Sequence, residues 1–173
     1  SADAALSTLP LSLIPGLKGY LERYPYGCTE QTVSKALPAV LLYGNADLGG
    51  DSKLAETSLR HTVTRLREMQ NSEGGFGYWP GGSVNDFVSV YALHYLLLAR
   101  EKHMPVPDDL LRRAEEYAKQ IAAKTPNSLS EARTIAYAIY LLTRDGVVTA
   151  NYLPGLLQYL ENNARDTWRN DLT

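Results

Sequence analysis

The apolar residues of this 173-residue chain recur at every third or fourth position almost from end to end. This spacing places them on one face of an α-helix, and no run of four or more residues shows the alternation that is typical of a half-buried strand. The pattern predicts helices at residues 9–22, 29–43, 52–70, 84–101, 108–124, 129–144 and 150–164. The sequence therefore predicts an all-α fold.

Two of these predicted helices carry related sequences. The segment from Ser83 to Leu97 resembles the segment from Ser128 to Leu142, with each residue matched to one 45 positions later. A repeat of about 45 residues has room for two helices and their connections, so each repeat is expected to be a helical hairpin. Stacked hairpins bury a continuous core, with odd-numbered helices in one layer and even-numbered helices in the other.

Length and charge limit what the chain is expected to do. A chain of this length fits a single domain over residues 1–173. The net charge is −2 and basic residues are scattered, which argues against nucleic acid or an anionic membrane surface as the main partner. The chain has no apolar run long enough to span a bilayer, and Ser1 to Pro15 lacks the basic start of a signal peptide.

Cys28 is the only cysteine, which excludes an internal disulfide or a cysteine-based zinc cluster. It lies three residues before Gln31, at the predicted start of a helix, so the two side chains share one helix face. Attack of the Cys28 thiolate on the Gln31 carboxamide would expel ammonia and form an internal thioester. Unpaired first-turn amides favour negative charge on a carbonyl oxygen, Gly27 permits a close approach, and Glu30 is a candidate proton carrier.

The Cys-x-x-Gln spacing alone leaves two other interpretations open. A lone cysteine on a helix is commonly a small buried apolar residue without chemistry. It could also be a nucleophile of the papain type, which needs a histidine partner. The three candidates, His61, His94 and His103, do not lie in a recognisable sequence context.

The segment Tyr24-Pro25-Tyr26-Gly27-Cys28-Thr29-Glu30-Gln31-Thr32 closely resembles the thioester signature of bacterial alpha-2-macroglobulins. Its Gly-Cys-x-Glu-Gln core is shared with complement C3 and animal alpha-2-macroglobulins. The segment from Gln70 to Trp79, with its Gly-Gly-Phe-Gly run, is similar to the segment that follows in these domains. Val90 to Leu98 resembles their next inner helix, and the resemblance continues to Trp168.

This resemblance implies part of an α/α toroid, cut from a larger multidomain protein, with a thioester at a helix N-terminus. It implies a single-use covalent protease trap rather than an enzyme, without a cofactor. A lysine amine of the attacking protease would attack the Gln31 carbonyl, and Cys28 would leave as a free thiol. The implied partners are attacking proteases and other domains of the parent chain. The implied location is the periplasm, with membrane contact only through a distant lipid anchor.

Two departures from the family pattern qualify these expectations. Position 29 is Thr, where vertebrate relatives usually have Gly. The toroid of the family is also longer than this chain, so the surface that protects the bond is expected to be incomplete. Tyr20, Tyr24 and Tyr26 are candidates to exclude water, or else ordinary aromatic residues. We expect the thioester not to survive in this chain alone, which leaves Cys28 as a thiol near Gln31.

Two rival functions use the same architecture. One is a helical-repeat scaffold that binds partners without chemistry. The other is an α/α-toroid enzyme, of the terpene-cyclase or the glycan-cleaving type, although an acidic metal-binding motif or zinc site is not recognisable. Glu73 and Asp86 are the candidate carboxylate pair for glycan cleavage. The segment from Gly74 to Gly77 lacks the Gly-Lys-Ser/Thr ending of a phosphate-binding loop.

Overall fold

The computed structural model describes residues 27–170, so the predicted helix 9–22 and Tyr20, Tyr24 and Tyr26 lie outside the described residues. The described helices are α2 (Thr29–Leu41), α3 (Ser52–Met69), α4 (Asp86–Glu101), α5 (Asp108–Ala122), α6 (Leu129–Arg144) and α7 (Leu153–Asn163), with 3-10 turns η2 (Ala46–Leu48) and η3 (Trp168–Asn170). Residues 27–170 contain isolated β-bridges but no strand. The predicted all-α fold is confirmed, and helix boundaries differ from the predicted ones by at most three residues.

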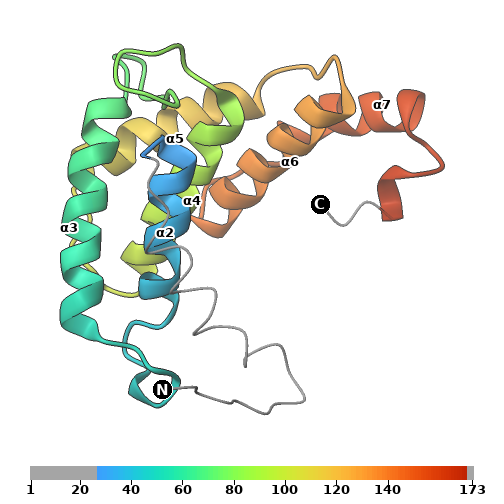
Figure 1. Cartoon of the computed structure of the whole chain (residues 1–173). Helices are drawn as coiled ribbons and strands as arrows, with labels where there is room; N and C mark the ends of the chain where they lie inside the picture. Colours follow the sequence, from blue (N-terminus) through green and yellow to red (C-terminus); the bar gives the residue numbers. More distant parts are fainter. Residues whose placement is uncertain (1–26, 171–173) are drawn as a thin grey trace.

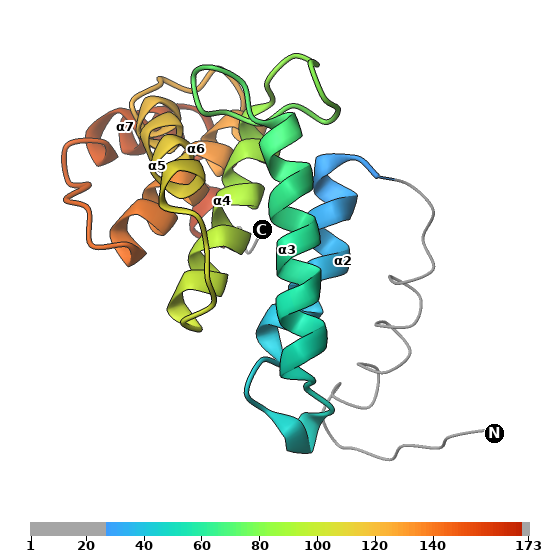
Figure 2. The same ribbon diagram turned by 90° about the vertical axis from the view of Figure 1, so that its left-hand side faces the viewer.

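The helices alternate between two layers. Helices α2, α4 and α6 are neighbours in one layer, because α4 contacts both α2 and α6. In the other layer α3 packs on α2, α5 packs on both α4 and α6, and α7 packs on α6. The layers follow a curved arc from α3 to α7 (Figure 1), and the turned view shows α3 beside α2 and α5 beside α4 (Figure 2). The predicted separation of odd and even helices is confirmed.

Helix α4 lies in the middle of the arc and is buried on several faces. Its buried residues are Val88, Ser89, Val90, Ala92, Leu93, Tyr95, Leu96, Leu97 and Ala99. Helix α5, in contrast, has a polar side and one apolar side that faces the core. Helix α4 is buried on more faces than α5 because of its place in the arc, where α2, α5 and α6 are its neighbours.

The helical repeat is present, but its register differs from the predicted one. Helices α4 and α6 begin at Asp86 and Leu129 and have the same length, so the helices repeat every 43 residues. At this offset buried Tyr95 corresponds to buried Ala138. Tyr140, which the sequence pairs with Tyr95, is 54% exposed while Tyr95 is 0% exposed. The apolar pattern was sufficient to find the repeat. Aligning the two tyrosines, however, made the predicted offset two residues too long.

The two helices begin with different caps. In the sequence, Ser128-Leu129-Ser130-Glu131 and Ser83-Val84-Asn85-Asp86 both fit a capping box, in which an acidic residue follows a hydroxyl residue three positions later. Ser128 does cap α6, because its Oγ accepts a hydrogen bond from the Glu131 N–H at 3.1 Å. The cap of α4 is instead Asn85, whose Oδ1 accepts from the Val88 N–H at 3.0 Å. Val84 forms a bridge with Gly77, which keeps the chain extended up to Asn85.

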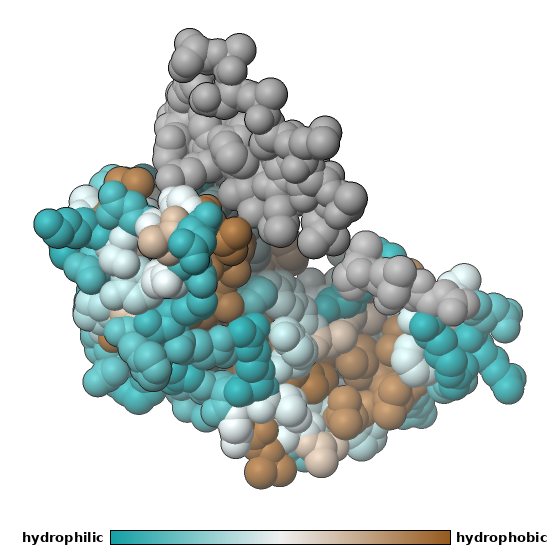
Figure 3. All heavy atoms as spheres, turned by 90° about the horizontal axis from the view of Figure 1, so that it is seen from below, coloured by the Kyte–Doolittle hydropathy of each residue, from teal (hydrophilic) through white to brown (hydrophobic). Residues whose placement is uncertain are grey.

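Large apolar side chains also reach the surface of the described region. Seen from below, apolar residues form patches beside a mostly hydrophilic area (Figure 3). The large hydrophobic side chains that are exposed in the described region include Phe87, Tyr140, Leu153 and Leu157, on α4, α6 and α7. Within residues 27–170, every helix is too short or too polar to cross a lipid bilayer.

Candidate reactive site at the start of α2

Cys28 and Gln31 contact each other at the start of α2. Cys28 is the N-cap residue, with φ −67° and ψ 163°, and Gln31 is the third helical residue. The Cys28 N–H donates to Gln31 Oε1 at 3.3 Å, and the Gln31 N–H in turn points to the Cys28 sulfur. This reciprocal arrangement is a capping box in which a thiol takes the place of the usual hydroxyl. The structure thus brings the Gln31 carboxamide to the backbone of Cys28, and the Cys28 side chain toward the backbone of Gln31.

The three candidate residues differ in their exposure. Cys28 is 7% exposed and Gln31 is half-buried. The side chain of Glu30, the candidate proton carrier, is exposed, and no hydrogen bond joins its carboxyl group to either of these two described residues. The contacts therefore connect Cys28 with Gln31 and do not include Glu30.

Thr29 fixes this turn to a distant segment of the chain. It is 0% exposed, and its N–H donates to the Tyr78 carbonyl at 3.0 Å. Its hydroxyl donates to the Gly77 carbonyl at 2.5 Å and also touches the sulfur of Met69. The two sequence motifs, residues 24–32 and 70–79, therefore meet at Thr29. From the sequence alone, Thr29 stood out only as a departure from a vertebrate glycine.

The segment that accepts the hydrogen bonds of Thr29 is a tight loop between α3 and α4. Gly74 has φ +97°, and a Cβ there would lie 2.1 Å from the Arg113 carbonyl oxygen, so a side chain does not fit. A Cβ on Gly77 would lie 3.0 Å from the carbonyl oxygens of Gly82 and Ser83. Phe76 is 0% exposed and donates its N–H to Ser89 Oγ at 2.8 Å. These constraints hold the carbonyls of Gly77 and Tyr78 in place opposite α2.

Arg65 of α3 contacts the residue before the cysteine, a contact that the sequence pattern did not reveal. Its Nη2 donates to the Gly27 carbonyl at 3.4 Å, and its guanidinium also pairs with Glu68. The Thr32 hydroxyl donates to the same Gly27 carbonyl. A Cβ on Gly27 would meet Arg65 Nη2 at 3.8 Å, an ordinary contact, so its described neighbours do not require glycine there.

The chain is similar to known bacterial proteins in both sequence and fold. The alpha-2-macroglobulin of Rickettsia conorii is 40% identical to this chain over 175 residues, which cover 96% of the chain and 9% of that protein. The chain belongs to the alpha-2-macroglobulin family. It spans about a tenth of the length of the curated relatives it matches. No family model matches the chain.

Solved bacterial alpha-2-macroglobulins share the helical arrangement. The native Escherichia coli protein, solved from domain MG7 to its C-terminus, superposes with a TM-score of 0.75 at 26% identity, over 84% of this chain and 25% of that chain. A Salmonella alpha-2-macroglobulin reacted with methylamine superposes with a TM-score of 0.73 at 27% identity, over 84% of this chain and 10% of that chain. The all-α architecture is therefore that of a segment of this family.

None of the three histidines of this alpha-2-macroglobulin segment bonds to Cys28 in the described structure. His61 and His103 are exposed. His94 is half-buried between α4 and α6, where its Nδ1 lies 2.5 Å from the Tyr137 hydroxyl and its Nε2 lies 3.4 Å from Arg144. The hypothesis of a papain-type nucleophile therefore finds no histidine partner among these residues.

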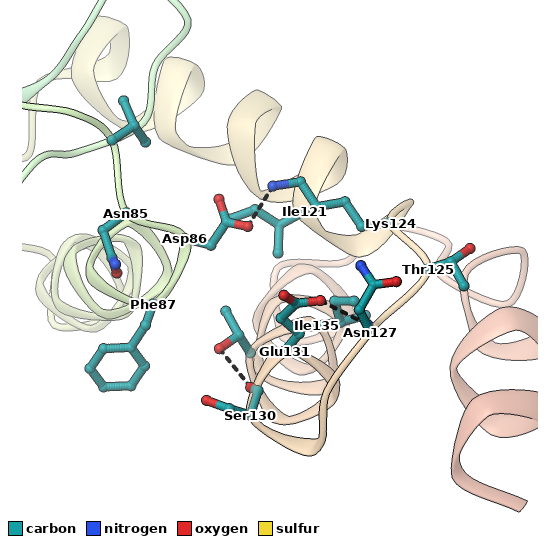
Figure 4. A pocket seen from close by; sticks show the side chains of 12 residues that line it. Asn85, Asp86, Phe87, Ile121, Lys124, Thr125, Asn127, Ser130, Glu131 and Ile135 are labelled. Carbon is teal, nitrogen blue, oxygen red and sulfur yellow. Dashed lines mark hydrogen bonds and ion pairs between the residues drawn. The ribbon is translucent and has the colours of Figure 1, made fainter. Parts of the chain in front are cut away.

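The two carboxylates proposed for glycan cleavage do not share a cavity. Asp86 lines a cavity of about 670 Å³ between the starts of α4 and α6 and the end of α5, whereas Glu73 is exposed and lies outside its lining. Asp86 pairs with Lys124 (Figure 4). It also accepts a hydrogen bond from the Tyr117 hydroxyl. Glu131, also in this cavity, accepts from the Asn127 N–H at 2.8 Å. Both cavity carboxylates are thus engaged in structural contacts, and residues 27–170 contain no group of three metal-binding side chains.

His94 is expected to make the stability of this segment depend on pH. Burial, together with the nearby Arg144 cation, lowers the pKa of His94 below its ordinary value of 6.5, against the opposing effect of Glu101. The unfolded chain therefore binds a proton at a higher pH than the folded one. The stabilisation that neutral His94 gives to the folded state is complete above pH 6.5, the ordinary pKa of histidine. It is lost as the pH falls through the lower pKa that His94 has in the folded state.

We expect His94→Asn to reduce the loss of stability between about pH 7 and about pH 5, because asparagine does not titrate. Urea unfolding at the two pH values measures this difference. Leu157→Asn, on the exposed side of α7, is the control and should keep the pH dependence of the wild type. If His94→Asn and the wild type lost the same stability over this pH interval, His94 would not be the group that causes the pH dependence.

Proposed function

We propose that Cys28 and Gln31 form an internal thioester through which the protein traps proteases covalently. In the first step the Cys28 sulfur attacks the side-chain carbonyl carbon of Gln31. A carbon–sulfur bond forms, the carbon–nitrogen bond breaks, and the amide nitrogen leaves as ammonia with the thiol proton. No oxidant and no cofactor is needed, since the reaction is an acyl transfer.

The observation that carries this proposal is the reciprocal contact between Cys28 and Gln31. The Cys28 N–H donates to Gln31 Oε1, the oxygen on which negative charge develops when the carbonyl carbon is attacked. The same contact folds the carboxamide back over the residue that carries the sulfur. The first turn of a helix adds a partial positive charge at this position. Nucleophile, acyl group and stabilising donor therefore come from four consecutive residues.

In the second step a lysine amine of a protease attacks the Gln31 carbonyl carbon. A carbon–nitrogen bond forms, the carbon–sulfur bond breaks, and the amine loses a proton while Cys28 leaves as a thiol. The protease is then joined to the protein by an amide. The Salmonella relative reacted with methylamine was treated with a small primary amine, the chemical class of a lysine side chain. Each molecule reacts once, so the protein acts as an inhibitor and not as an enzyme.

The wider setting is part of the proposal. The chain spans about a tenth of its curated relatives, and we propose that the remaining domains of such a parent chain present the site to proteases. A trap for proteases is useful where foreign proteases arrive, which favours a location outside the cytoplasm. We propose the periplasm as this location.

Mass spectrometry of the freshly purified full-length protein tests the thioester directly. We expect its mass to be lower than the sequence mass by one ammonia. We also expect no reaction of Cys28 with iodoacetamide until methylamine is added, which then releases one thiol for each molecule. A control incubation without amine shows whether the thiol is merely exposed by handling. A full-length protein with the complete sequence mass, and a thiol that reacts without amine, would overturn the proposal.

A further inference from the structure

Thr29 occupies the one position between the proposed nucleophile and its acyl group where a side chain is completely buried. It is 0% exposed, whereas Glu30, its neighbour in the same turn, is exposed. A buried hydroxyl normally needs a partner, and this one has the Gly77 carbonyl at 2.5 Å. Its methyl-bearing side chain therefore fills space while its oxygen connects α2 to the loop between α3 and α4.

The main-chain contact of Thr29 acts on Cys28. The peptide group that joins Cys28 to Thr29 donates its N–H to the Tyr78 carbonyl at 3.0 Å. Because this bond fixes the plane of that peptide, it fixes the ψ angle of Cys28, which is 163°. The extended ψ places the Cys28 sulfur toward the Gln31 N–H, as the N-cap position requires.

The loop that accepts these two hydrogen bonds is itself tightly held. Buried Phe76 precedes Gly77, and its carbonyl accepts from the Asn85 N–H at 2.9 Å. The Gly77 N–H donates to the Met69 carbonyl at 3.1 Å at the end of α3. The two carbonyls that face Thr29 are therefore fixed relative to α3 and α4, and not only to each other.

We infer that Thr29 is a positioning residue for formation of the thioester. Its hydroxyl and N–H hold the first turn of α2 against Gly77 and Tyr78, so that the Cys28 sulfur and the Gln31 carboxamide keep the mutual orientation that ring closure needs. Without the hydroxyl the buried Gly77 carbonyl loses its donor, and the turn shifts to restore a partner. Small displacements of reacting groups reduce rates strongly. This inference rests on the proposed function.

The test compares substitutions at Thr29 in the full-length protein. Thr29→Val keeps the shape and removes the hydroxyl, and Thr29→Ala also removes the hydroxyl but leaves room for the carbonyl to be hydrated. In both, we expect the ratio of molecules lacking one ammonia to molecules of full mass to fall on the order of tenfold among folded protein. Thr29→Ser restores the hydroxyl and should recover most of the wild-type ratio.

A matched control separates positioning from loss of stability. Thr149 is 8% exposed, and its hydroxyl bonds to that of Thr143 at 2.6 Å in the connection from α6 to α7. Thr149→Val should lower the thermal midpoint yet leave the ammonia loss unchanged. If Thr29→Val does not fold, Thr29→Ala gives the measurement.

The outcomes distinguish this inference from the function it rests on. A wild-type protein of full mass, with no thiol released by methylamine, overturns the proposed function whatever the variants do. A wild-type protein that carries the bond, together with folded Thr29→Val and Thr29→Ala proteins that carry it to the same extent, overturns only the role of Thr29. A low ratio in these two variants, recovered in Thr29→Ser and normal in Thr149→Val, supports it.

Discussion

Cys28→Ser is expected to abolish the reaction with methylamine while leaving α2 at least as stable as in the wild type. Serine is among the preferred N-cap residues, and its oxygen can accept the Gln31 N–H that now points to sulfur. The free energy of unfolding should rise by up to about 1 kcal/mol, whereas no mass difference and no amine-released thiol remain. Denaturant unfolding and mass spectrometry measure the two effects on one sample.

Gln31→Glu is the matched control for Cys28→Ser. It keeps the acceptor oxygen that the Cys28 N–H binds, and a carboxylate is favourable in the first turn of a helix. This variant has no amide nitrogen to lose, so it should show its full mass and a thiol that reacts without amine. A mass lower by one ammonia in either variant would mean that the lost nitrogen does not come from this pair.

Phe76→Ala is expected to cause the largest loss of stability among the variants considered. Phe76 is 0% exposed in the core between α3 and α4, and a substitution that removes a buried phenyl ring costs about 3–5 kcal/mol. The change also removes the side chain that anchors the loop before Gly77 and Tyr78 in the core, so the fraction of molecules with the proposed thioester should fall as well. Urea unfolding gives the stability, and the mass gives the thioester content.

Phe87→Ala provides the comparison at a surface position. Phe87 is 43% exposed at the start of α4, where it stacks on Tyr91 with a ring-centroid distance of 6.1 Å. Its removal should cost about 1 kcal/mol or less and leave the thioester content unchanged. Equal losses of unfolding free energy in Phe76→Ala and Phe87→Ala would show that the Phe76 side chain does not stabilise the core more than an exposed phenylalanine does.

The periodic sequence was sufficient to predict the helices and their layers. Helix α6, for example, occupies the predicted residues 129–144, because Ser128 caps one end and Gly146 follows the other. The register of the repeat was not predictable in the same way. Tyr95 and Tyr140 look equivalent in the sequence, but only the packing of the other helices around α4 makes Tyr95 a core residue.

The site was predictable where its contacts are local. Cys28 and Gln31 are three residues apart across a helix start, the spacing at which the N-cap residue and the third helical residue make reciprocal contacts. The contacts of Thr29 with Gly77 and of Arg65 with Gly27 join residues 48 and 38 positions apart, which periodicity does not reveal. The resemblance identified residues 70–79 as part of the same domain, but only the fold shows that their carbonyls bind the first turn of α2.

The oxygen that caps α2 takes no part in the exchange of atoms that we propose. Gln31 Oε1 stays on its carbon whether that carbon bears the original nitrogen, the sulfur or a foreign amine, so the acceptor of the Cys28 N–H is present in all three states. A spent molecule would then begin this helix in the same way as a fresh one. A cellular factor that distinguishes reacted from unreacted molecules would therefore have to recognise the released Cys28 thiol, the bound protease or a conformational change elsewhere.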